Sequence, residues 1–162
     1  MQHARDPSKT RNALKGIAIA LTVFTFFCIM SRIDYIVHSH LYKFGLQFSY
    51  EWATEYWILY TFVYVIFSLA IGLMFWLGSH RTLRDCKISI AIVATVVLLT
   101  IGGLQDLLFF VLWAGGLPLP NVVWWWNPLH HIFGTWNSTS QIISTSLSLF
   151  GATLIWIQTI WE

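Results

Sequence analysis

The segment from Ile88 to Trp113 constrains the fold more than any other part of the chain. It contains no lysine, arginine or glutamate, and its one carboxylate belongs to Asp106. The hydrocarbon core of a bilayer, about 30 Å thick, is crossed by a helix of about 20 predominantly apolar residues. Because the backbone finds no water to bond with at that depth, a single spanning segment is helical. The segment therefore predicts a transmembrane helix.

Further apolar segments of similar length lie on both sides of this one. We predict spanning helices at 14–37, 57–77, 88–110 and 139–161, all within one membrane domain that covers residues 1–162. The chain is 57% hydrophobic and 10% charged, whereas soluble domains have about 25% charged residues. The predicted fold class is an all-α integral membrane protein, a four-transmembrane-helix bundle surrounded by the lipid bilayer. The net charge of +2 gives no reason to expect nucleic acid as a partner.

The basic residues are distributed unevenly between the two sides of this predicted bundle. The N-terminal segment and the 80–87 connection carry seven of the nine: Arg5, Lys9, Arg11, Lys15, Arg81, Arg84 and Lys87. The other side carries Arg32 and Lys43. Because cytoplasmic loops are enriched in lysine and arginine, we expect both termini to be cytoplasmic (N-in/C-in).

Small residues mark the places where helices of the bundle are expected to come close. Gly102 and Gly103 lie within the third predicted span. In the fourth, small residues recur every four positions, at Ser140, Ser144, Ser148 and Ala152. Small side chains allow membrane helices to approach closely, so we expect this stripe to face another helix and not lipid.

Residues 114–137 have an unusual composition for a connecting segment. They contain Pro118, Pro120, Pro128 and the run Trp124–Trp126, and they contain no lysine, arginine, aspartate or glutamate. Tryptophan is enriched at the level of the lipid headgroups. We therefore expect an aromatic-rich extracytoplasmic cap, formed by this segment together with residues 31–50.

Asp106 is the most unusual residue of the third span. A helix rises about 27 Å between Ile88 and Asp106, at about 1.5 Å per residue, so the carboxyl group is expected near the outer edge of the hydrocarbon. An ionisable group at that depth is costly and marks a functional site by default. We predict Asp106 as the candidate catalytic residue. The alternative is a structural ion pair between Asp106 and Arg32.

Most of the histidines and acids fall on the predicted outer side. Asp34 and His38 are four residues apart, which places both on one face of a helix, and Glu51 and Glu55 share this spacing. Imidazole and carboxylate together suit copper, zinc or iron. We therefore predict a transition-metal site formed from Asp34, His38, Glu51, Glu55, His130 and His131. The alternative is that the acids pair with basic side chains or face water and that the histidines are interfacial.

The sequence leaves three classes of function open. The first is a membrane protein whose outward-facing histidine and carboxylate cluster binds a metal or a small molecule, with other membrane subunits or a second copy as partners. The second is an enzyme acting on a lipid or small hydrophobic substrate, with Asp106 and a histidine as acid and base. The third is a structural membrane subunit. An apolar cavity reaching Asp106 would favour the enzyme.

Overall fold

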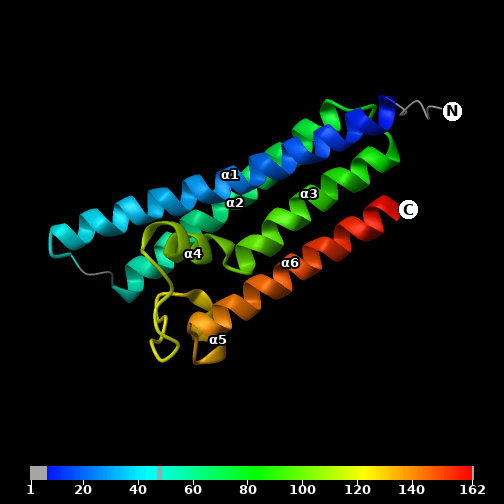
Figure 1. Cartoon of the computed structure of the whole chain (residues 1–162). Coiled ribbons are helices and arrows are strands. Elements are labelled where there is room, and N and C mark those ends of the chain that lie inside the picture. Colours follow the sequence, from blue (N-terminus) through cyan, green and yellow to red (C-terminus); the bar gives the residue numbers. More distant parts are fainter. Residues whose placement is uncertain (1–6, 47–48, 162) are drawn as a thin grey trace.

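The computed structural model describes residues 7–46 and 49–161, and these contain helices but no β-strand. The long helices are α1 (Pro7–Lys43), α2 (Tyr50–Leu77), α3 (Leu83–Ile101) and α6 (Ser138–Trp161). They run roughly along one direction, as Figure 1 shows. The short helices α4 (Leu104–Leu108) and α5 (Pro128–Phe133) and the π-helical turn η1 (Phe109–Trp113) lie toward one end. The start of α1 and the end of α6 lie at the other end, beside the α2–α3 connection (Figure 1).

Within the described residues, three helical segments are individually long and apolar enough to cross a membrane. They are Leu14–Lys43, Glu51–Leu77 and Ser138–Thr159. A fourth candidate is the bent pair Leu83–Ile101 and Leu104–Trp113, whose two parts differ in direction by 61°. The outer faces of the long helices carry exposed apolar side chains, as a lipid-facing surface requires: Leu21, Phe62, Ile66, Leu147 and Phe150. The structure supports an all-helical membrane protein with three or four spanning segments.

The third apolar segment, predicted as one helix over 88–110, is broken in the structure. α3 ends at Ile101, and α4 begins at Leu104 after Gly103, which has a φ of 69°. That left-handed conformation is readily adopted by glycine because it has no Cβ. A Cβ at Gly103 would also overlap the side-chain amide of Gln141. The break therefore depends on glycine at this position.

The break is stabilised by side chains from α6. The Gly102 carbonyl accepts hydrogen bonds from Gln141 Nε2 at 3.0 Å and from Thr145 Oγ1 at 2.7 Å. Gln141 Nε2 also lies 2.9 Å from the Gly103 carbonyl oxygen. Non-helical backbone at membrane depth is tolerated only where protein groups satisfy it. Gln141 and Thr145 meet that requirement.

The small-residue stripe of α6 is only partly buried. Ser148 and Ala152 are buried, whereas Ser140 and Ser144 are half-buried. A Cβ at Gly102 would overlap Ser148, so close approach of α3 and α6 occurs there as expected. The buried face of α6 is formed instead largely by its polar residues, because these make hydrogen bonds to the broken third helix.

Aromatic side chains fill the space between α1 and α2. The rings of Phe26 and Phe67 are stacked with centroids 3.5 Å apart, and Phe27 lies 4.8 Å from Tyr64. These contacts belong to a core that also includes Val96 of α3. Together with α4, the same two helices also line a cavity.

We expect Gln141→Leu to lower the free energy of unfolding by about 1–3 kcal/mol, because it leaves the buried Trp136 Nε1 without its acceptor and removes one of the two donors to the Gly102 carbonyl. Equilibrium unfolding of the detergent-solubilised protein measures this. Gln158→Leu is the matched control, since Gln158 lies on the same helix and is exposed. Equal stability of the two variants would contradict the role assigned to Gln141.

Candidate functional site

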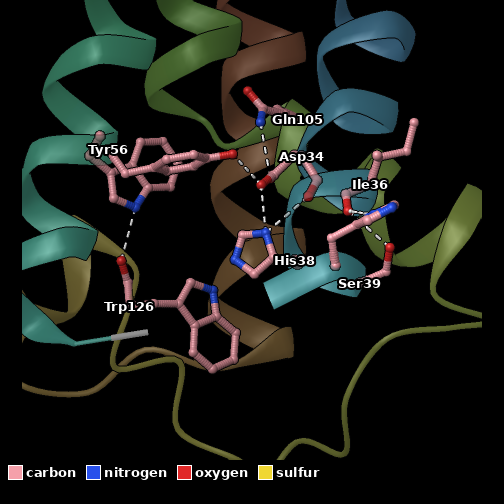
Figure 2. A network of polar contacts seen from close by, with 9 residues as sticks. Asp34, Ile36, His38, Ser39, Tyr56, Gln105 and Trp126 are labelled. Carbon is pink, nitrogen blue, oxygen red and sulfur yellow. Dashed lines mark hydrogen bonds and ion pairs between the residues drawn. The ribbon is translucent and has the colours of Figure 1, made fainter. Parts of the chain in front are cut away.

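Asp34 is the meeting point of three helices. It lies on α1, is 6% exposed, and accepts a hydrogen bond from the Tyr56 hydroxyl of α2 at Oδ1. Its Oδ2 accepts one from Gln105 Nε2 of α4 at 3.1 Å. Figure 2 shows these side chains converging on the carboxyl group. A buried carboxylate with several donors is well satisfied, and it ties α1 to both partners.

His38 completes this group from the next turn of α1. Its Nδ1 lies 2.9 Å from Asp34 Oδ1 and 3.0 Å from the Asp34 carbonyl oxygen. The contact is an ion pair when the imidazole is protonated. The predicted four-residue spacing of Asp34 and His38 therefore does bring the two side chains together (Figure 2).

Gln105 extends the network into the core of the bundle. Its Oε1 accepts a hydrogen bond from the Tyr64 hydroxyl at 2.7 Å, while its Nε2 donates to Asp34. Tyr56, Tyr60 and Tyr64 follow one another at four-residue intervals on α2, so they share a face. That face is directed toward α1 and α4.

Asp106 belongs to a second, separate set of contacts. It is 6% exposed, and its Oδ2 accepts a hydrogen bond from Asn127 Nδ2 at 3.0 Å. Asn127 Nδ2 also lies 3.3 Å from Gln141 Oε1, which accepts a further bond from Trp136 Nε1 at 2.9 Å. Asp106 is thus linked, through Asn127, to the same glutamine that stabilises the helix break.

A cavity of about 490 Å³ joins the two sets. Asp34, His38 and Asp106 all line it, so Asp106 shares this cavity with Asp34 and His38. The rest of the wall is mainly aromatic and includes Tyr56, Trp57, Tyr60, Phe109, Phe110, Trp125 and Trp126. Such a cavity places carboxyl, imidazole and phenol groups within an otherwise apolar wall, where a largely apolar ligand could contact them.

The remaining residues of the predicted metal site lie elsewhere. Glu51 and Glu55 are exposed on α2 and do not line the cavity. His130 and His131, on α5, have ring centroids 5.3 Å apart, and His131 lines a different cavity of about 460 Å³. Among the described residues, no three histidine, cysteine, aspartate or glutamate side chains are grouped so that they could hold a metal ion. The metal assignment of the six residues stays a prediction.

Arg32 does not neutralise Asp106. Its guanidinium carbon lies 4.7 Å from the centroid of the Trp113 ring and 5.3 Å from that of Tyr35. These two described side chains, Arg32 and Asp106, form no ion pair; the contact of Asp106 is with Asn127. A cation over an aromatic face is itself a favourable arrangement, so Arg32 has partners of its own.

Several site residues were not predicted from the sequence. The tyrosine ladder could have been found, because hydroxyl groups at positions 56, 60 and 64 repeat along one face of an apolar helix. Gln141 carries a weaker signal, as one of two glutamines in an apolar span. Asn127 carries none, because its role depends on how the 114–127 segment folds back onto α4.

Comparisons of the chain with models of known protein families, with curated proteins and with solved structures found no match. Function is therefore inferred from the geometry of the site.

We expect Tyr56→Phe to lower the free energy of unfolding by about 1 kcal/mol or more, because Asp34 loses a buried donor. Chemical unfolding in detergent measures the change. Tyr35→Phe is the control, since the Tyr35 hydroxyl makes no hydrogen bond with the described residues and its ring contacts remain. The role of Tyr56 would be refuted by losses of the same size in both variants.

Proposed function

We propose that this chain is a multi-pass membrane protein that binds a small, predominantly apolar molecule in the cavity between α1, α2 and α4. The observation that carries the proposal is the cavity of about 490 Å³, whose largely aromatic wall includes both buried carboxyl groups. Small-molecule sites commonly have volumes of about 300–1,000 Å³, apolar walls and a few polar groups.

The polar groups of the wall support binding over a purely structural role. Ionisable side chains at membrane depth are costly, and they mark ligand and substrate sites. Asp34 is consistent with a structural role, since α1, α2 and α4 all meet at it. Among the described residues Asp106 forms no ion pair with another helix, yet it lines the same cavity. A bound molecule gives that carboxyl group a function.

Metal binding is the second candidate. It is supported by the adjacent donors of Asp34 and His38, which both line the cavity. Copper, zinc and iron are the metals that suit such donors. A stoichiometric transition metal in elemental analysis of the purified protein would favour this candidate.

The enzyme hypothesis uses the same cavity. His38 and Asp106 both line it, so they would serve as base and acid toward a lipid or other hydrophobic substrate. Association with other membrane subunits or with a second copy of the chain also stays a prediction.

The proposal includes an orientation. The 80–87 connection, with Arg81, Arg84 and Lys87, lies at the same end of the molecule as both described ends of the chain (Figure 1). By the enrichment of basic residues in cytoplasmic loops, we propose that this end is cytoplasmic, with four spans. The aromatic segment 114–137 would then form the extracytoplasmic cap over the cavity.

We expect ten-carbon amphiphiles to stabilise the protein saturably in phosphatidylcholine nanodiscs, because a ligand that binds the folded state raises its stability. The probes are 1-decanol and decylamine, and the measurement is the melting temperature against probe concentration. Leu41→Trp should abolish the effect of both, since Leu41 lines the cavity and the larger ring fills it.

Leu59→Trp is the matched control for this experiment. Leu59 is 61% exposed on α2 and does not line the cavity, so this variant should respond as the wild type does. Absence of saturable stabilisation by both probes in the wild type would overturn the proposed function.

We expect a membrane-impermeant maleimide to spare Cys86 in right-side-out vesicles, because the exposed Cys86 lies at the basic end. In a Cys86→Ser background, the Leu119→Cys variant should be labelled, since Leu119 is 68% exposed in the aromatic segment. The reverse pattern of labelling would reverse the proposed orientation.

A further inference from the structure

We infer that the molecule bound in this cavity is a cationic amphiphile, with an ammonium group at Asp106 and an apolar tail along the aromatic wall. This inference rests on the proposed function and specifies the class of ligand. It is carried by the place of Asp106 in the cavity, by its missing counter-charge and by the aromatic wall around it.

Asp106 retains binding capacity on the cavity side. The carboxyl group is 6% exposed and lines the cavity, and Asn127 donates to its Oδ2. Its Oδ1 has no hydrogen-bond donor in the described part of the chain. A carboxylate has room for several donors on its two oxygens, so an N–H group entering the cavity would find an acceptor there.

The charges lining the cavity leave room for one more positive group. His38 is adjacent to Asp34 and neutralises it when protonated. No lysine or arginine lines the cavity in the described residues, and Arg32 lies over Tyr35 and Trp113. A carboxyl group at this depth exists as the neutral acid or beside a cation. Because no lysine or arginine of the described lining supplies that cation, an ammonium group of the ligand would provide it to the ionised Asp106.

The walls of the cavity suit a cation with an apolar body. Aromatic faces attract ammonium groups, most strongly when water is excluded. Phe109 and Phe110 directly follow the α4 turn that carries Asp106, and Trp126, which also lines the cavity, has its ring centroid 6.5 Å from that of Phe110. An anionic headgroup would instead meet two carboxyl groups, which repel it.

The test compares headgroups on one chain length. The full-length wild type, in phosphatidylcholine nanodiscs at pH 7, is titrated with decylamine, 1-decanol or decanoate, and the apparent Kd is obtained from the shift in melting temperature. Decylamine is an ammonium ion at this pH. Because charge-assisted hydrogen bonds are roughly twice as strong as neutral ones, decylamine should bind about tenfold or more tightly than 1-decanol, and decanoate should bind most weakly.

Two acid-to-amide variants locate the effect. Asp106→Asn should remove the preference for decylamine over 1-decanol while still accepting the bond from Asn127. Asp85→Asn changes an acid at the opposite, basic end, where Asp85 contacts Thr82, and should keep the preference. If Asp106→Asn does not fold, the comparison of headgroups on the wild type still decides the outcome.

Each outcome has a distinct meaning. Equal binding of decylamine and 1-decanol would overturn the inference and leave the proposed function intact. A preference that survives in Asp106→Asn would also overturn it. Stabilisation by zinc chloride with none by decylamine would overturn it in favour of the metal candidate. Failure of both 1-decanol and decylamine to bind would remove the proposed function as well.

Discussion

In hydrocarbon, the backbone carbonyl of Gly102 must have a hydrogen-bond donor, and the rest of this structure depends on how that need is met. A continuous helix would supply the donor from its next turn, but the chain turns away at Gly103. Gln141 and Thr145 of α6 supply it instead. Because unsatisfied polar groups cost several kcal/mol in lipid, α6 must pack against the end of α3 with its polar face inward. The same hydrogen bonds therefore stabilise the helix break and determine how α6 packs against α3.

The break also determines the site. Since α4 leaves the direction of α3 by 61°, its consecutive residues Gln105 and Asp106 reach different partners. Gln105 bonds Asp34 of α1 and Tyr64 of α2, whereas Asp106 bonds Asn127. In an unbroken helix, the Gln105 and Asp106 side chains would lie on adjacent faces of a helix that runs past the cavity. Here a short helix ends at the cavity, which residues of α1 and α2 also line.

Much of the architecture could be predicted from composition, because the need to bury backbone polar groups in lipid permits few alternatives. The helical class follows from the apolar segments, and the Asp34–His38 pairing follows from helical periodicity. The broken third span could not be predicted, since Gly102 and Gly103 alone do not distinguish a break from close packing; the distinction lies in Gln141, which is remote in sequence. For the same reason Asn127 was missed.

The length of α1 has a consequence for how a ligand would arrive. α1 has 37 residues, about 55 Å at about 1.5 Å per residue, nearly twice the roughly 30 Å of hydrocarbon. With Leu14 at one edge of the hydrocarbon, Asp34 lies about 30 Å further along, at the boundary between acyl chains and headgroups. An amphiphile dissolved in that leaflet already has its headgroup at this depth. Its search is then two-dimensional, the bilayer is its reservoir, and occupancy follows its partition coefficient and not its solubility in water.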